Sequence, residues 1–190
     1  MTDLLRYAAE LEDRTDRPLP PVASWNPPFR GEIDLVIRRD GVWVHEGTPI
    51  ARARLVRLFS TVLRREGDRY FLVTPAEKLG VRVEDAPFLA VIARREGEGA
   101  DQTFVFTTNV GDRVAAGPDH PIAFRCREGE WAPYIEVRDG LEALIARAPY
   151  YDLVAAGETR EIDGEAWFGV SSGGAFFPFR PAREISVGET

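Results

Sequence analysis

The residues that most often carry catalysis or bind zinc are scarce in this chain. It has two histidines, His45 and His120, and a single cysteine, Cys126. Because an ordinary zinc site draws most of its ligands from these two residue types, no metal or cofactor site is expected. The sequence contains no phosphate-binding loop, nucleophile elbow or metalloprotease helix. It therefore argues against an enzyme without excluding one.

The remaining reactive groups have plain structural interpretations. His45 lies beside Glu46 on an expected strand, which is typical of a surface or half-buried residue rather than a general base. Cys126 lies on an expected strand whose alternation places the neighbouring arginines on the opposite face, so we predict an inert, buried thiol. Acidic residues number 31 of 190, so neighbouring carboxylates arise by chance and spacing alone identifies no acid–base pair.

Arg52 is the strongest candidate for a functional side chain. The apolar spacing predicts a helix from Thr48-Pro49 to about Arg65, with threonine as a cap and proline in the first turn. At about 100° per residue, Arg52 projects into the apolar arc of this helix, beside Phe59. A cation against apolar surface needs a partner, and in a first helical turn it also meets the positive end of the helix dipole.

Two kinds of partner are open for Arg52. A protein carboxylate, Glu77 or Asp85, would make the pair structural, because buried charges are usually paired. The anion of a bound ligand would make it functional, and Lys78 in the polar loop that follows Val73 could then contact the same anion.

A second group of polar side chains follows a strongly apolar strand. Thr108 and Asn109 end that strand, either as a turn closed by side-chain to backbone hydrogen bonds or as one wall of a ligand pocket. Arg138 ends a later strand. These three residues could line a cleft together with Arg52 and the acidic loops.

These candidates are positioned by an expected α+β fold of duplicated strand-strand-helix-strand units. Two-residue alternation and glycine turns predict strands at 33–38, 42–45, 70–73, 81–85, 88–94, 103–107, 122–126, 134–137, 160–163, 165–170 and 176–179. Capped helical patterns are expected at 49–65 and from Gly140 to Gly157, the latter with Asp139 and Glu142 as a capping box. The order of elements around both helices is similar, which suggests an internal repeat. A ligand cleft between the two copies follows from this arrangement, because small molecules usually bind where domains meet.

The expected domains are residues 1–30, a short helix and a proline-rich arm anchored by Trp25; 31–80, an α+β unit; 81–180, a mostly β domain with one helical segment; and 181–190, a frayed tail. A net charge of −7 and a pI near 5.0 disfavour nucleic acid and anionic membranes as partners. One cysteine and the absence of an apolar leader or span predict a cytoplasmic protein.

Several motifs resemble the bacterial domain of unknown function 1285 family. They are Trp25-Asn26-Pro27, Gly31-Glu32-Ile33-Asp34, Asp40-Gly41-Val42-Trp43, Glu46 to Arg52, Leu58-Phe59-Ser60, Thr74 to Lys78, Val83 to Phe88 and Thr107 to Val110. The resemblance implies a duplicated α+β core whose C-terminal domain is pleckstrin-homology-like. It also implies a nucleotide-like ligand between the domains and a role in signal transduction.

The leading hypothesis is a non-catalytic binding or regulatory module for a small anionic, nucleotide-like ligand. Arg52 and Lys78 would contact its phosphate or carboxylate, and Thr108 and Asn109 would hydrogen-bond a base or sugar. One alternative is a hydrolase with Glu77 or Asp85 as general base. Another is a protein-docking module, with a protein partner or a second copy of the chain.

Overall fold

The computed structural model describes residues 19–127 and 130–185. The chain divides into two compact units. The first ends at Pro87 and also takes in Asp139–Leu141, while Phe88–Arg138 and the chain from Glu142 onward form the second. The domain boundary expected from sequence, at 80/81, would divide the strand Lys78–Val83. The structure keeps this strand whole within the first unit. Each unit is described below by itself.

The first unit is a six-stranded sheet with one helix. After the 3-10 turn η1 (Val22–Ser24), its elements are β1 (Phe29–Ile37), β2 (Trp43–His45), β3 (Thr48–Pro49), α2 (Ala53–Thr61), β4 (Leu63–Glu66), β5 (Arg69–Val73) and β6 (Lys78–Val83). The strand order is β3-β2-β1-β6-β5-β4, with β1 and β6 parallel and the other pairs antiparallel. The predicted hairpin at Asp40-Gly41 is confirmed, since Gly41 has a φ of 81° and its N–H donates to Arg38 O.

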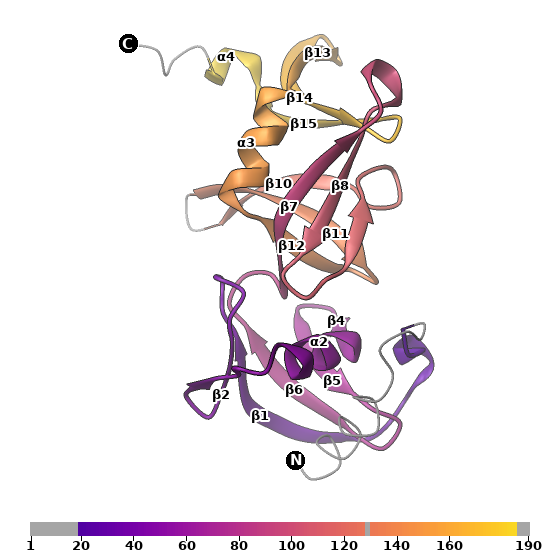
Figure 1. Cartoon of the computed structure of the whole chain (residues 1–190), viewed down its shortest axis with the longest axis vertical. Helices are drawn as coiled ribbons and strands as arrows, with labels where there is room; N and C mark the ends of the chain where they lie inside the picture. Colours follow the sequence, from indigo (N-terminus) through magenta and orange to yellow (C-terminus); the bar gives the residue numbers. More distant parts are fainter. Residues whose placement is uncertain (1–18, 128–129, 186–190) are drawn as a thin grey trace. The chain divides into compact units, whose positions relative to one another are not determined.

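Helix α2 lies across one face of this sheet (Figure 1). Phe59 on the helix is buried and stacks on Trp43, which is 1% exposed. On the sheet, Leu72 is fully buried, as expected for a core residue of a central strand. At the amino-terminal side, Trp25 packs against a cluster that contains Phe71, so its predicted role as an anchor is confirmed.

The predicted helix from Thr48 to Arg65 is wrong at both ends. Thr48–Pro49 is the edge strand β3, paired with β2, and the helix begins only at Ala53. It ends at Thr61, and Leu63–Glu66 becomes β4, which pairs with β5 through the Gly67-Asp68 turn. Both ends form strands because pairing with β2 and with β5 satisfies the backbone hydrogen-bonding groups there. The local apolar spacing at these positions fits a helix as well as a strand, and cross-strand packing decides between them.

The second unit combines a six-stranded sheet with a three-stranded one. Its elements are β7 (Phe88–Glu96), the 3-10 turn η2 (Gly99–Asp101), β8 (Thr103–Thr108), β9 (Arg113–Ala115), β10 (Ile122–Arg127), β11 (Glu130–Arg138), β12 (Leu141–Ile145), α3 (Arg147–Ala155), β13 (Glu158–Ile162), β14 (Glu165–Ser172), β15 (Ala175–Pro181) and α4 (Ala182–Ile185). The large sheet has the order β10-β11-β12-β7-β8-β9, and the small sheet is β13-β14-β15.

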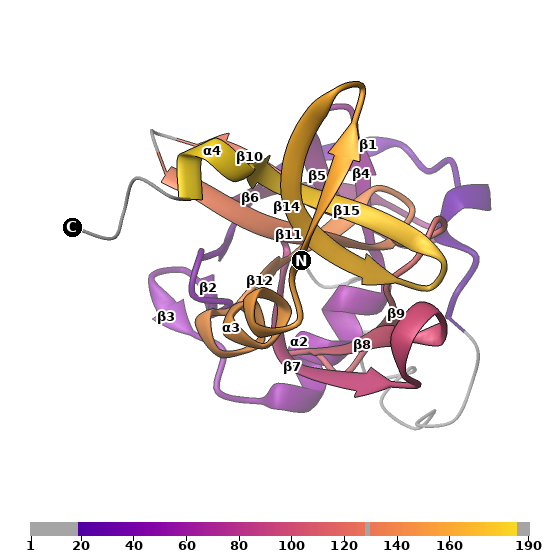
Figure 2. The same cartoon turned by 90° about the horizontal axis from the view of Figure 1, so that it is seen from above.

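The turn between β14 and β15 anchors the small sheet to the large one (Figure 2). Ser172 is 1% exposed; its Oγ donates to Ala116 O over 2.8 Å and accepts from Phe104 N over 2.8 Å. Gly173 N donates to Gln102 O over 3.0 Å. The predicted hairpin at Ser171 to Gly174 is therefore confirmed, and the turn itself is a tertiary contact.

The predicted helix from Gly140 is also wrong in its first half. Leu141–Ile145 forms β12, which pairs in parallel with β7, and the helix α3 spans only Arg147–Ala155. Glu142 is consequently a buried strand residue paired with Arg125, not part of a capping box. Both units mix sheets with few helices, as an α+β or mostly β protein does, while duplication and a pleckstrin-homology-like fold stay predictions.

Other expectations have mixed outcomes. Cys126 is exposed, so the prediction of a buried thiol is wrong; β10 is an edge strand, and its cross-strand partner Trp131 is 62% exposed. His45 is half-buried, as predicted.

Ala182–Ile185 is helical, where a frayed tail was expected, and the predicted helix near the amino terminus lies outside the described residues. In the part of the chain that the structure describes, no helix is long and apolar enough to cross a membrane.

Candidate functional site

Arg52 lies at the amino-terminal end of α2, not on its apolar face. It is the N-cap residue, with extended backbone angles, and its carbonyl oxygen accepts from Leu55 N at 3.0 Å and Val56 N at 3.2 Å. Its side chain is exposed and forms no ion pair or hydrogen bond with any residue in 19–127 or 130–185. Of the two partners left open for Arg52, the protein carboxylate Glu77 or Asp85 is therefore not the one observed, because the helix begins at Ala53 rather than at Pro49 and leaves Arg52 as an exposed cap.

Arg54, in the first turn of α2, shares this environment. It is exposed, and within the described residues it too has no ion pair. The first turn contains no acidic residue, and no side chain caps the helix. Two arginines therefore occupy the N-cap and the first turn, at the positive end of the helix dipole, an arrangement that attracts anions.

Lys78 belongs to a network on the sheet of the first unit. Its Nζ lies 2.9 Å from a carboxylate oxygen of Glu66 and 4.9 Å from the ring centroid of Phe71. Arg64 also pairs with Glu66 and donates to Trp25 O over 2.7 Å. The hydrogen bond from Lys78 lowers the pKa of the Glu66 carboxyl group, with Arg64 adding to the effect and burial opposing it. Lys78 thus has an internal counter-ion.

Glu77 and Asp85 lie beyond opposite ends of β6. Glu77 is 8% exposed, in a turn where Thr74 Oγ1 accepts from Glu77 N over 3.2 Å, and among the described residues one of its carboxylate oxygens has no hydrogen-bond partner. Asp85 has a side chain that is 6% exposed, 3.3 Å from Arg39. The six residues of β6 separate the two positions along the chain, so the structure places them at different ends of the sheet.

Thr108 and Asn109 close a turn in the second unit. Thr108 Oγ1 accepts from Asp112 N over 3.0 Å, and Asn109 Oδ1 accepts from Leu89 N over 3.0 Å. Of the two interpretations of this strand end, side-chain to backbone closure of a turn is the one observed.

Arg138 joins the same cluster. It pairs with Asp112 at 2.6 Å, and its guanidinium carbon lies 4.9 Å from the ring centroid of Phe88. A cation stacked on an aromatic ring and paired with a carboxylate has a structural role of its own. Asp112 therefore links Thr108 to Arg138, while Asn109 bonds to the backbone of Leu89. The cleft between the units stays a prediction.

Sequence reasoning missed two charged residues of the second unit. Arg95 on β7 and Asp152 on α3 line a hollow, and neither forms an ion pair with a described residue. The signal for Asp152 was present in the sequence, because the predicted helix end at Gly157, close to the observed end of α3 at Ala155, already places it in the last turn. No group of histidine, cysteine and acidic side chains suited to a metal occurs among the described residues.

Comparison with known families matches nearly all of the described chain. Residues 20–86 match the model of the domain of unknown function DUF1285, N-terminal domain, and residues 87–179 match the C-terminal domain of the protein of unknown function DUF1285. The chain belongs to the DUF1285 family. The boundary between the two DUF1285 domains, at 86/87, falls within one residue of the boundary between the two compact units.

Two solved DUF1285 structures resemble the chain. One, from Silicibacter pomeroyi DSS-3, is 48% identical over 96% of this chain and 97% of its own, with a TM-score of 0.86. The other, from Shewanella baltica OS155, is 29% identical over 63% of this chain and 89% of its own, with a TM-score of 0.51. A search of curated proteins gives no match.

Proposed function

We propose that this protein is a non-catalytic binding module that holds a small anionic ligand at the amino-terminal end of α2. The observation that carries the proposal is that Arg52 and Arg54 are both exposed there and unpaired within the described residues. The family resemblance adds that the ligand is nucleotide-like and that binding serves signal transduction, and the sequence composition adds that this takes place in the cytoplasm.

The placement of these arginines is unfavourable without an anion. A cation in a first helical turn opposes the helix dipole, at about 0.3–1 kcal/mol for each charge. Natural helices usually place acidic or capping side chains at this position, and α2 has neither. A bound anion would offset the repulsion and accept hydrogen bonds from the first-turn N–H groups.

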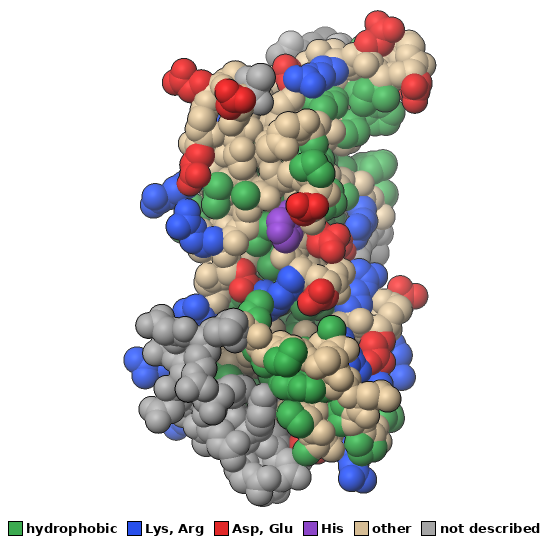
Figure 3. Space-filling model, turned by 90° about the vertical axis from the view of Figure 1, so that its right-hand side faces the viewer, with side chains coloured by type: hydrophobic (Ala, Val, Ile, Leu, Met, Phe, Trp, Pro, Cys, Tyr) green, Lys and Arg blue, Asp and Glu red, His purple; other side chains and the backbone are tan. Residues whose placement is uncertain are grey.

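The surrounding sequence is also unusual in its charge. Basic and acidic side chains are interspersed on the face of the molecule in Figure 3. Between Glu46 and Glu66, however, the chain has five arginines and no acidic residue, although its net charge is −7. This local excess of arginines creates a positive electrostatic potential around α2, which attracts small anions.

Arginine favours phosphate or carboxylate as the ligand group. Its planar guanidinium presents two parallel N–H donors that match the spacing of oxygens in either anion. A nucleotide phosphate would therefore suit Arg52 and Arg54, with its base and sugar extending over neighbouring surface.

Calorimetric titration of the full chain with AMP, ADP and inorganic phosphate tests the proposal. Arg52→Gln and Arg54→Gln should each weaken binding about tenfold or more, since a charge-assisted hydrogen bond contributes about 1.5–3 kcal/mol. Arg57→Gln is the matched control, because Arg57 is an exposed arginine in the middle of α2, past its first turn, and is unpaired among the described residues. Absence of binding in the wild type, or an equal loss in all three variants, would contradict the proposal.

Neither rival function has a specific observation in its favour. A hydrolase would need Glu77 or Asp85 beside the bound substrate, and Asp85 already pairs with Arg39. We keep the duplicated core and the pleckstrin-homology-like C-terminal domain as proposals from the resemblance, to be tested by comparing the units of further DUF1285 structures.

A further inference from the structure

The second unit contains a hollow between β7 and α3. Its volume is about 360 Å³, which is within the range of small-molecule sites, about 300–1,000 Å³. It is lined by Ala93, Arg95, Phe104, Asp152, Ala155 and Ala156. All six lining residues belong to the second unit.

The spacing of the lining residues explains why they share one space. Ala93 and Arg95 are two residues apart on β7, so their side chains leave the strand on the same face. Asp152, Ala155 and Ala156 follow the three- and four-residue spacing of one helix face. The alanines contribute only methyl groups, which leaves room between the strand and the helix.

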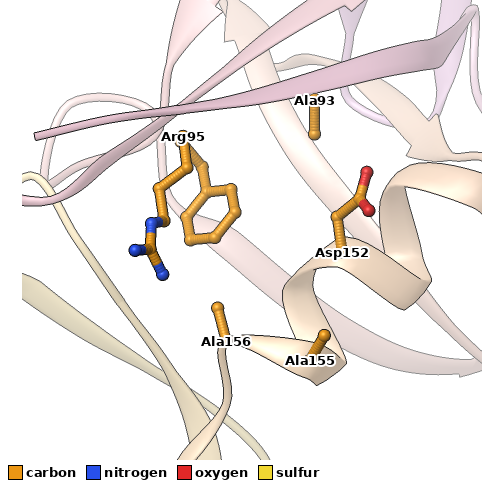
Figure 4. A pocket seen from close by; sticks show the side chains of 6 residues that line it. Ala93, Arg95, Asp152, Ala155 and Ala156 are labelled. Carbon is orange, nitrogen blue, oxygen red and sulfur yellow. The ribbon is translucent and has the colours of Figure 1, made fainter. Parts of the chain in front are cut away.

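Two opposite charges line this space without meeting. Figure 4 shows Arg95 projecting from β7 on one side and Asp152 from α3 on the other. Both are exposed, and neither has an ion-pair or hydrogen-bond partner for its side chain in the described part of the chain. By contrast, Arg138 in the same unit pairs with Asp112 at 2.6 Å.

The position of Asp152 adds a second, independent argument. It lies in the last turn of α3, and no basic residue in that turn offsets the negative end of the helix dipole. A carboxylate at a helix carboxyl terminus is repelled by the unpaired carbonyl groups there. A cation placed between Asp152 and the end of the helix would be attracted by both.

We infer that this hollow binds a small dipolar molecule, whose anionic group pairs with Arg95 and whose ammonium group pairs with Asp152 and the end of α3. A molecule with only one of the two charges pairs with either Arg95 or Asp152 and leaves the other side chain unpaired. The alanine and Phe104 surfaces accommodate a short apolar chain between the charged ends. The expected ligand class is therefore a small amino acid with separated charges. This inference does not depend on the proposed anion site.

Titration of the full chain with ω-amino acids from glycine to 6-aminohexanoate tests this inference, with hexanoate and hexylamine as single-charge probes. At least one ω-amino acid should bind at least tenfold more tightly than either single-charge probe. Arg95→Gln and Asp152→Asn should each weaken that binding about tenfold or more.

Arg94→Gln is the matched control, because Arg94 is an exposed arginine on the opposite face of the same strand, and it should leave affinity unchanged. Asp152→Asn should also raise the melting temperature of the free protein, since it removes a charge that opposes the helix dipole. Failure of every ω-amino acid to bind the wild type would overturn the inference. Equal affinity for hexanoate, or unchanged binding in Asp152→Asn, would do the same while leaving the anion site of α2 untouched.

Discussion

The turn between β14 and β15 offers a sharp test of how the small sheet is held in the second unit. Gly173 and Gly174 both have positive φ, 56° and 76°, where an L side chain costs about 1–2 kcal/mol. A Cβ at Gly174 would meet open space, whereas one at Gly173 would lie 2.6 Å from Ala116 O. Real Cβ atoms essentially never come within 3.0 Å of a backbone oxygen, so the turn must move in Gly173→Ala. In Gly174→Ala no such movement is needed.

The size of the difference follows from the bonds that such a movement breaks. The N–H of Gly173 donates to Gln102 O over 3.0 Å, and Ser172 Oγ donates to Ala116 O over 2.8 Å. Each hydrogen bond contributes about 0.5–1.5 kcal/mol. Gly174→Ala should therefore destabilise the second unit by about 1–2 kcal/mol, and Gly173→Ala by about 2–5 kcal/mol.

Differential scanning calorimetry of the full chain measures this difference. For a unit of about 100 residues, 1 kcal/mol shifts the melting temperature by about 4–8 °C. The transition of the second unit should fall by about 4–16 °C in Gly174→Ala and by roughly twice as much in Gly173→Ala, with the first unit's transition unchanged. Equal shifts in the two variants would show that the turn is not anchored through residues 102 and 116.

Two further predictions concern side chains with measurable chemistry. Because Lys78 lowers the pKa of Glu66 in the folded state, the carboxylate stabilises the first unit above its ordinary pKa of about 4.3. That stability is lost as the pH falls through the lowered value. In urea unfolding, Glu66→Gln should be less stable than wild type at pH 7, the difference should shrink as the pH falls below the ordinary pKa, and a pH-independent difference would contradict this. Cys126, being exposed, should react with a chromogenic disulfide reagent in the folded protein, and a thiol that reacts only in denaturant would contradict the fold of β10.

Short-range signals predicted the strands of this protein well. Alternation identified β1, β5, β7 and β8, and the glycine at position 41 located the hairpin that joins β1 to β2. These features depend on the strand period and on a left-handed turn residue, both of which are local properties of the sequence. These strands and the hairpin can therefore be predicted without knowledge of long-range contacts.

The helix boundaries could not be predicted in the same way. Leu63 continues the apolar spacing of α2, yet it lies opposite Leu72 in the β4–β5 hairpin. Ala143 has high helix propensity, yet it pairs with Phe88 in the parallel ladder of β12 and β7. In both cases a strand partner distant in sequence or across a turn decides the conformation, because a ladder adds cross-strand packing that propensity does not describe.

An error in one helix boundary concealed the first candidate site. With a helix starting at Thr48, Arg52 belongs to an apolar face; with the true start at Ala53, it is an exposed cap. The end of α3 was predicted at Gly157, close to its observed end at Ala155, so Asp152 lies in the last turn in both cases. What the sequence could not predict is that Arg95 on β7 lines the same hollow, because that placement depends on a long-range contact.

Helices α2 and α3 share one property that links both proposals. Each has nine residues, and each carries at one end a charge that its own dipole opposes: arginines at the start of α2 and an aspartate in the last turn of α3. Among the described residues neither helix provides the counter-charge. Because such placements cost about 0.3–1 kcal/mol per charge, ligands of the opposite charge bound at these ends would recover that energy. The helix ends, rather than the helix faces, are therefore where binding should be sought.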